Sequence, residues 1–90
     1  MKIIRYNEEK RAKILENPDR KIDLQIVALM INEGDILDIR PSPNYPNQKV
    51  YIIKYNDYTC AVPFVETEKE IFLKTVFPSR ALHKIYSKYF

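Results

Sequence analysis

The fold of this chain is decided by the stretch Gln48–Glu66, which reads QKVYIIKYNDYTCAVPFVE. Two runs rich in β-branched and aromatic residues flank the pair Asn56-Asp57, and such pairs form tight turns between antiparallel strands. The sequence therefore predicts a hairpin with strands over Gln48–Tyr55 and Tyr58–Glu66. Pro63 has no N–H, so the second strand cannot complete its ladder of hydrogen bonds on one side of that position.

Further strands are predicted on both sides of this hairpin. Thr67-Glu68 indicates a second turn, and Lys69–Phe77 is expected to return beside the hairpin as a fourth strand. Asp35–Arg40 also alternates like a strand, and the segment 41–47 after it has the Pro and Asn content of a loop.

The first part of the chain, residues 1–34, is predicted to be helical. Asn7 is a suitable N-cap for a first helix, and Asn17-Pro18 is expected to end it. Asp19 or Asn17 would open a second helix, which Gly34 terminates in the left-handed conformation. The apolar positions expected to face the sheet are Ile22, Ile26, Leu29 and Met30, with Val27 and Ile31 beside them.

Together these elements predict an α+β fold in one domain over residues 1–90. It would contain two N-terminal helices, a four-stranded antiparallel β-meander and a short C-terminal helix, Arg80–Tyr89, entered through Pro78-Ser79. The turns set a register in which Tyr55 faces Tyr58 and Phe64 faces Ile71.

This register divides the side chains of the sheet between two faces. The face expected to pack on the helices carries Tyr51, Ile53, Tyr55, Tyr58, Cys60, Val62, Phe64, Ile71, Leu73, Thr75 and Phe77. The other face carries Val50, Ile52, Lys54, Thr59, Ala61, Val65, Glu70, Phe72, Lys74 and Val76, with Ile36, Asp38 and Arg40 from the first strand. This half-apolar, half-basic face is either an open interaction groove or is covered by the closing helix or the N-terminal segment.

Composition excludes several classes of protein. Gly34 is the only glycine, which excludes Gly-rich phosphate loops, and one Cys with one His cannot build a structural zinc site. Cys60 is the only cysteine, and the N-terminus lacks a signal-peptide pattern, so we expect a cytoplasmic protein without a membrane span. The net charge of +3 permits a nucleic-acid partner without requiring one, and no acidic residue follows Glu70.

Two motifs near the ends of the chain resemble those of the BrnT-type toxins, which belong to the RelE-like group of toxin–antitoxin ribonucleases. They are Tyr6-Asn7-Glu8-Glu9-Lys10 and Val76-Phe77-Pro78-Ser79-Arg80. The resemblance covers nearly the whole chain. This sequence departs from the family at Pro63, at Pro78 and in the loop 45–49.

The resemblance implies a toxin that cleaves RNA as an endoribonuclease without a metal or other cofactor. It also implies a cognate antitoxin, often one with a ribbon-helix-helix DNA-binding domain, that neutralises the toxin. A homodimer, or a heterotetramer with the antitoxin, would be compatible with this class.

Metal-free RNA cleavage needs proton transfer and a cation beside the phosphate, and the basic residues supply candidates. Arg80 is the first, because its planar guanidinium matches a phosphate, and Lys54 and Lys74 are expected to flank a phosphate track on the open face. His83, the only His, is the candidate acid or base. The residues expected to bind RNA without reacting are Arg40, Thr59 and Lys84.

Each candidate has a plainer explanation. Exposed lysines and Arg80 often serve only to keep a surface solvated, and His83 could face the solvent or an antitoxin. The alternative function for the whole chain is a non-catalytic protein- or RNA-binding module on the same scaffold.

Overall fold

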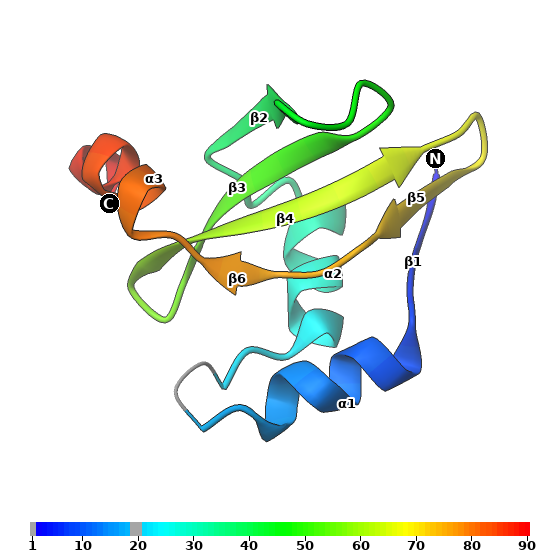
Figure 1. Cartoon of the computed structure of the whole chain (residues 1–90), viewed down its shortest axis with the longest axis horizontal. Helices are drawn as coiled ribbons and strands as arrows, with labels where there is room; N and C mark the ends of the chain where they lie inside the picture. The colour runs from blue at the N-terminus through cyan, green and yellow to red at the C-terminus, as the bar shows by residue number, and fades with distance from the viewer. Residues whose placement is uncertain (1, 19–20) are drawn as a thin grey trace.

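Six strands form one mixed sheet in a computed structural model that describes residues 2–18 and 21–90 (Figure 1). The elements in chain order are β1 (Ile3–Tyr6), α1 (Glu8–Glu16), α2 (Leu24–Asn32), β2 (Asp38–Pro41), β3 (Lys49–Tyr55), β4 (Tyr58–Glu66), β5 (Glu70–Leu73), β6 (Phe77–Pro78), α3 (Arg80–Tyr86) and the 3-10 helix η1 (Ser87–Tyr89). The strand order is β1-β5-β4-β3-β2, and β6 also pairs with β4. The predicted α+β class and the three helices are confirmed.

The central hairpin forms as predicted. Tyr55 pairs with Tyr58 and Lys54 with Thr59, and this antiparallel register continues along β3 and β4. Asn56 and Asp57 have φ angles of 52° and 61°. Both therefore lie in the left-handed region, as a two-residue hairpin turn that follows the twist of the strands requires.

The second turn is longer than predicted. The predicted register of the strand that follows it is therefore wrong by two residues. The Thr67 hydroxyl accepts hydrogen bonds from the backbone N–H groups of Lys69 and Glu70, at 3.3 and 3.1 Å. This local side-chain bond extends the turn. Phe64 consequently pairs with Leu73 instead of Ile71.

The predicted fourth strand, 69–77, is broken into β5 and β6. Lys74 donates its backbone N–H to the Pro63 carbonyl at 2.8 Å, but Pro63 has no N–H to return. The ladder stops there and resumes with Ala61 paired to Phe77, which inserts one extra residue. Because of the extra residue, Val76 and Phe77 each lie on the face of the sheet opposite to the predicted one. Val76 is fully buried in the core, and Phe77 lies on the other face.

The N-terminal segment contains a strand that was predicted to be helical. β1 pairs with β5 in parallel, with Ile4 opposite Ile71. The sheet is therefore mixed, and it is not the purely antiparallel four-stranded meander that the sequence predicts. Arg5, which points away from the core, forms an ion pair with Glu70 at 3.1 Å.

The two N-terminal helices are present, with boundaries that differ from the prediction for the second. Asn7 caps α1 and accepts from the N–H groups of Glu9 and Lys10, as predicted. α2 begins after the N-cap Asp23, and Gly34 follows it with a φ of 77°. The prediction that Asp19 opens this helix lies outside the described residues.

The buried face of α2 also differs from the predicted stripe. Leu24, Val27 and Ile31 are buried, whereas Ile26 and Leu29 are 47% and 56% exposed. Ile22, predicted to lie in the helix, is buried in the segment before it.

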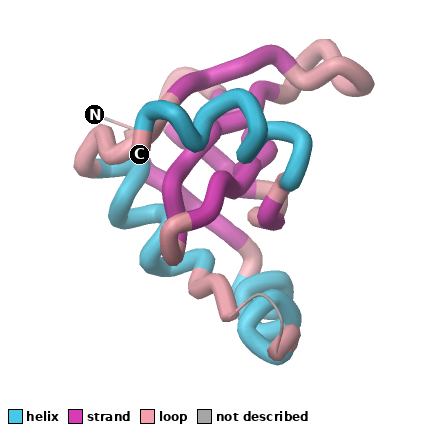
Figure 2. The backbone as a smooth tube through the Cα atoms, turned by 90° about the vertical axis from the view of Figure 1, so that its left-hand side faces the viewer, coloured by secondary structure: helices cyan, strands magenta, loops and turns pink. Residues whose placement is uncertain are grey.

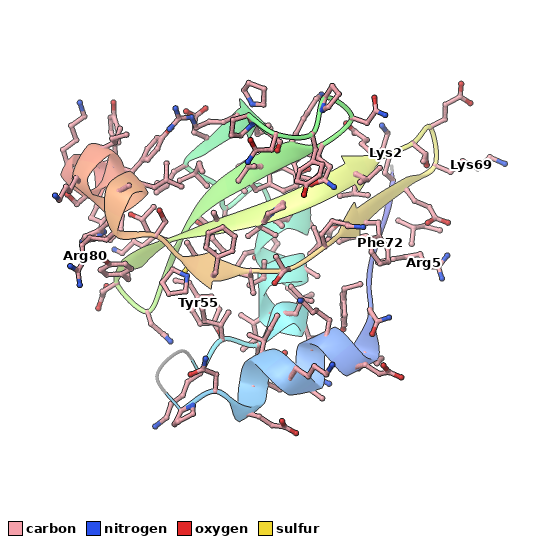
Figure 3. The ribbon with its side chains drawn as sticks, viewed as in Figure 1. Lys2, Arg5, Tyr55, Lys69, Phe72 and Arg80 are labelled. Atoms are coloured by element: carbon pink, nitrogen blue, oxygen red, sulfur yellow. The ribbon has the colours of Figure 1, made fainter. Side chains whose placement is uncertain are left out.

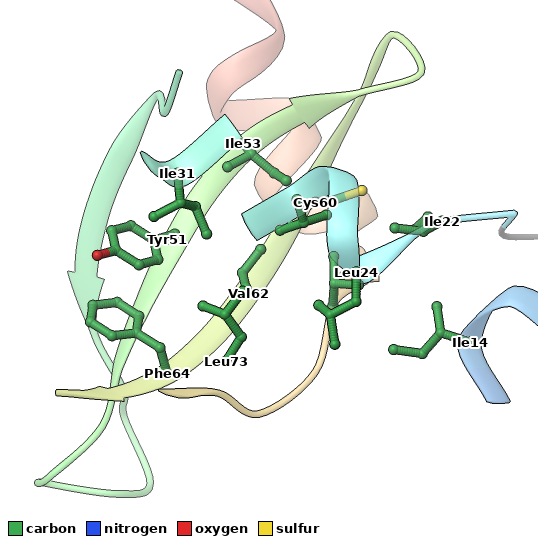
Figure 4. Close-up of a cluster of buried hydrophobic side chains, with 12 residues drawn as sticks. Ile14, Ile22, Leu24, Ile31, Tyr51, Ile53, Cys60, Val62, Phe64 and Leu73 are labelled. Carbon is green, nitrogen blue, oxygen red and sulfur yellow. The ribbon is translucent and has the colours of Figure 1, made fainter. Parts of the chain in front are cut away.

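The core lies between the sheet and these two helices (Figures 2 and 4). It consists of Ile14, Ile22, Leu24, Val27, Ile31, Tyr51, Ile53, Cys60, Val62, Phe64, Leu73 and Val76. Cys60 is core-facing, as predicted. Among the described residues, no helix has the length and apolar character needed to cross a membrane.

The C-terminal helix α3 packs against β4 on the other side of the sheet, where Ile52 and Ala61 are buried (Figure 1). Ser79 caps it by accepting from the N–H of Leu82. The closing helix therefore covers part of the face whose openness the sequence left undecided.

Candidate functional site

The end of β4 next to the hairpin turn holds the imidazole ring of His83. The Thr59 carbonyl accepts from the N–H of Ser79 at 3.0 Å, and the Thr59 N–H donates to His83 Nδ1 at 3.3 Å. The Thr59 hydroxyl oxygen also lies 3.0 Å from Nδ1. Because β6 ends at Pro78, the Thr59 N–H has the His83 ring as its hydrogen-bond partner and not a further residue of that strand.

This contact assigns the two ring nitrogens of His83. A backbone N–H can only donate, so Nδ1 accepts, and the proton of the neutral ring is carried by Nε2. Within residues 2–18 and 21–90, Nε2 has no hydrogen-bond partner. The Nε2–H group is thus the part of the ring that could donate to a ligand.

Aromatic rings and one cation surround His83. The Tyr58 ring stacks on it with centroids 4.1 Å apart, and the Phe90 ring meets it edge-on at 5.3 Å. The Lys54 ammonium lies 4.9 Å from the centroid of Phe90. We call Lys54, Tyr58, Thr59, His83 and Phe90 the His83 cluster.

A hollow of about 590 Å³ lies beside this cluster. We call it the Arg80 hollow, and its lining residues are Lys21, Ile22, Tyr55, Asn56, Tyr58, Cys60, Pro78 and Arg80. Figure 3 shows Arg80 and Tyr55 on the same side of the molecule, below α3. The Tyr58 ring belongs to both features, so it separates the hollow from His83.

A second hollow, of about 520 Å³, lies on the sheet face beneath α3. We call it the Ile52 groove, and it is lined by Arg40, Pro41, Pro43, Val50, Ile52, Ala61, Phe77 and Leu82. Arg40 is the one charged residue among these. The groove is therefore an apolar surface with a single cation at its border.

The position of α3 is fixed from β2. The hydroxyl of Tyr86, which is buried, donates to Asp38 Oδ2 at 2.6 Å. This hydrogen bond holds the pKa of Asp38 below its usual value and raises the pKa of Tyr86. The bond joins the end of α3 to the sheet and so positions the helix that carries His83.

No protein-family model matches this chain, and neither the curated proteins nor the solved structures contain a significant match to it.

The structure brings some of the predicted site residues together and separates others. Lys54 and His83 belong to one cluster, and Arg80, one turn before His83 on α3, lies in the hollow beside it. Lys84 is exposed on the same helix. Arg40 borders the Ile52 groove instead. Thr59 is completely buried and is in contact with His83.

Lys74 is the predicted catalytic residue that lies apart from the others. It is opposite Pro63, and its ammonium lies 5.9 Å from the Phe72 ring, in a hollow formed with α1. The predicted pairing of Phe64 with Ile71, continued along the strand, would put Lys74 opposite Ala61, but the observed register puts Phe77 there. Pro63 is four residues beyond Thr59 on β4, or about 13 Å at about 3.3 Å per residue.

Several residues of the site are not among the candidates from the sequence. The sequence assigns Tyr55 and Tyr58 to core packing, and it gives no role to Lys21 or to the side chain of Asn56. Phe90 is a possible base-stacking ring in the sequence, although contact with the core is the commoner explanation for it. The position of Tyr58 directly after the turn was an available signal, because a strand end exposes part of its side chain. Lys21, in a left-handed conformation with φ 46°, had no such signal.

The described residues contain no group of three or more His, Cys, Asp or Glu side chains placed to hold a metal ion. What the site offers is an oriented imidazole N–H, two nearby cations and aromatic rings. This combination suits an anionic ligand that carries flat rings.

Proposed function

We propose that this protein is the toxin of a toxin–antitoxin pair, a RelE-like, metal-independent endoribonuclease that acts on RNA in the cytoplasm. The observation that carries the proposal is the orientation of His83, whose Nδ1 accepts from the Thr59 N–H so that Nε2–H is left for a substrate. Lys54 belongs to the same cluster, and Arg80 lines the neighbouring hollow. The motifs at Tyr6–Lys10 and Val76–Arg80, which resemble those of BrnT-type toxins, support it.

The geometry favours a particular part for His83. Because the Thr59 N–H occupies Nδ1, a neutral ring is the form that fits, and its Nε2–H is a hydrogen-bond donor. Such a donor stabilises negative charge that develops on a phosphate oxygen in the transition state. His83 would therefore act chiefly by donating this hydrogen bond, and less by transferring a proton.

The reaction would proceed by attack of the RNA 2′-oxygen on the adjacent phosphorus. The bond from phosphorus to the 5′-oxygen breaks, which leaves a 2′,3′-cyclic phosphate and a 5′-hydroxyl. Water accepts the proton of the 2′-hydroxyl and another water supplies the proton of the leaving oxygen. Arg80 and Lys54 would offset the charge on the phosphate oxygens throughout.

The test is cleavage of RNA by the purified chain in the presence of a metal chelator. We expect products that end in 2′,3′-cyclic phosphate, and no cleavage where the 2′-hydroxyl is replaced by hydrogen. His83→Ala should lower kcat by roughly 10²–10³-fold, the usual effect of losing one donor to a developing oxyanion. His83→Gln should restore part of the rate, because a glutamine amide can donate a hydrogen bond but cannot shuttle a proton.

Lys69→Ala is the matched control, because Lys69 is exposed at the opposite end of the molecule (Figure 3). Its kinetics should equal those of the wild type. Expression of the intact chain should also arrest growth, and co-expression of the antitoxin, which we expect to be of the ribbon-helix-helix type, should relieve the arrest. A chain that neither cleaves RNA nor slows growth would remove the proposal.

The second candidate function is a non-catalytic binding module, and the Ile52 groove favours it. Its apolar lining and the cation of Arg40 suit a partner segment with apolar side chains and a carboxylate. This candidate predicts that the chain binds a partner protein or RNA without cleaving RNA. Binding of RNA alone would weaken steeply as salt is added.

A further inference from the structure

The Arg80 hollow has the dimensions and lining of a site for one nucleotide. Its volume of about 590 Å³ falls within the range of about 300–1,000 Å³ that small-molecule sites occupy. Its lining contains the cations Lys21 and Arg80, the aromatic rings Tyr55 and Tyr58, and the amide of Asn56. None of the described residues that line it is acidic.

These groups match the separate parts of a nucleotide. A guanidinium and an ammonium in one hollow suit a phosphate, and tyrosine rings suit the flat face of a base. The exposed amide of Asn56 can both donate to and accept from a base edge. The Tyr55 hydroxyl oxygen accepts from the N–H of Asp23 at 3.1 Å, and this bond helps to hold the ring in place beside the hollow.

The backbone of Lys21 has a conformation that is uncommon for a lysine. Its φ of 46° lies in the left-handed region, which residues other than glycine, asparagine and aspartate seldom adopt. Asn56, on the hairpin turn, is left-handed as well, with φ 52°. Two segments distant in sequence thus present polar side chains to one hollow.

Tyr58 connects the hollow to the proposed reaction. One ring contact of Tyr58 is the stack on His83, with centroids 4.1 Å apart, and the same residue lines the hollow. A base in the hollow would therefore lie one ring away from His83. Arg80, which also lines the hollow, would reach the phosphate between that nucleotide and the next.

We infer that the Arg80 hollow binds one nucleotide of a single-stranded RNA, with its phosphate between Lys21 and Arg80 and its base against Tyr55 and Tyr58. This inference rests on the proposed function, because it supplies the position of the nucleotide next to the scissile bond. It adds a binding role for Lys21, Tyr55 and Asn56.

The variant that tests the inference is Lys21→Asn. Asparagine removes the charge and tolerates the left-handed backbone, so the fold is preserved, and a thermal melt monitored by circular dichroism checks this. Lys69→Asn is the matched control, because it removes the same charge at the opposite end of the molecule (Figure 3).

The measurement is the affinity of a short single-stranded DNA oligonucleotide, which lacks the 2′-hydroxyl and is not cleaved. We expect Lys21→Asn to weaken binding by about five- to tenfold at low salt and to reduce the salt slope by about 0.7, the value for one contact to a single strand. Lys69→Asn should bind within about twofold of the wild type. In NMR titrations, the backbone amides of Lys21 and Asn56 should shift, and those of the Ile52 groove should not.

Equal weakening by Lys21→Asn and Lys69→Asn would overturn the inference, because it would mean that only overall charge matters. Full competition by inorganic phosphate at the same concentration as the oligonucleotide would also overturn it, because the base would then contribute nothing.

The outcomes separate this inference from the proposed function. Oligonucleotide binding that depends on Lys21, in a chain that does not cleave RNA, would keep the hollow and remove the ribonuclease. If Lys21→Asn cleaves RNA with an unchanged KM, the ribonuclease proposal stands and the nucleotide site in the hollow is contradicted.

Discussion

The backbone N–H of Thr59 and Nδ1 of His83 form a hydrogen bond, with the two nitrogens 3.3 Å apart. Thr59 thus pairs with Lys54 across the hairpin and with an imidazole on its other side. The contact is made where β4 passes the start of α3, so the fold itself orients the ring. The tautomer of the His83 ring is therefore a measurable consequence of the structure.

We predict that the neutral ring of His83 carries its proton on Nε2. The reason is that Thr59 offers a donor to Nδ1, which must therefore accept. Long-range ¹⁵N–¹H correlation spectra of the wild-type protein at neutral pH would show the Nε2–H form. A spectrum with the proton on Nδ1 would contradict the structure at this contact and the part proposed for His83.

Thr59→Val tests how far the hydroxyl contributes to holding the ring. It removes the oxygen 3.0 Å from Nδ1 and leaves the backbone N–H in place. The Nε2–H form should persist, while kcat for RNA falls by about tenfold, the equivalent of one lost hydrogen bond, and KM is unchanged. Thr59→Ser should recover the rate, since it restores the hydroxyl. A higher KM with an unchanged kcat would contradict this prediction, because Thr59 would then contribute to RNA binding.

Lys54 and Lys74 should differ in their effect on RNA cleavage, although the sequence places both on one face. The Lys54 ammonium lies against Phe90 in the His83 cluster, whereas Lys74 lies opposite Pro63. We expect Lys54→Ala to lower kcat/KM by about tenfold and Lys74→Ala to change it by no more than about twofold. Equal losses in steady-state assays would mean that RNA also follows β5.

The separation of the two lysines shows where sequence reasoning about the sheet ends. The first hairpin could be predicted because Asn56-Asp57 fixes the turn locally. The second could not, because the Thr67 hydroxyl selects a longer turn through bonds that composition does not reveal. Pro63 indicates in the sequence that one ladder hydrogen bond is missing. It does not indicate the extra residue that moves Val76 and Phe77 to the faces opposite to the predicted ones.

Two other errors have a different physical origin. β1 pairs in parallel with a strand more than sixty residues later, and nothing within Ile3–Tyr6 indicates that partner. In α2 nearly every residue is apolar, so that the pattern does not select one face. Of the basic residues that the sequence singles out, the structure brings Lys54 and His83 into one cluster and places Arg80 in the hollow beside it. The place of Tyr58 in that cluster could not be predicted, because a tyrosine next to a turn is equally consistent with core packing.

The observed face of α2 can be tested by stability measurements. Leu24 is fully buried, and Leu29, on the same helix, is 56% exposed. Leu24→Ala should lower the free energy of unfolding by about 2–5 kcal/mol, as is usual for a buried leucine. Leu29→Ala, its matched control, should change it by no more than about 0.5 kcal/mol. Chemical denaturation of both variants measures this difference. Similar losses of unfolding free energy would mean that Leu29 also packs against the sheet, as the sequence predicts.

The ion pair between Arg11 and Asp23 predicts how stability depends on pH. Arg11 Nε donates to Asp23 Oδ1 at 2.8 Å, and this bond lowers the pKa of Asp23 below its unfolded value. A lowered pKa stabilises the fold above about pH 4, the pKa of the unfolded state, and this stabilisation is lost as the pH falls through the pKa of the folded state.

Asp23→Asn keeps an oxygen for the cap of α2 but loses the charge, so it should lower the free energy of unfolding by about 1–2 kcal/mol at pH 7. In urea titrations this difference should shrink below about pH 4, while the exposed control Asp35→Asn should differ little from the wild type at any pH. A constant difference down to pH 2 would show that the charge of Asp23 contributes nothing.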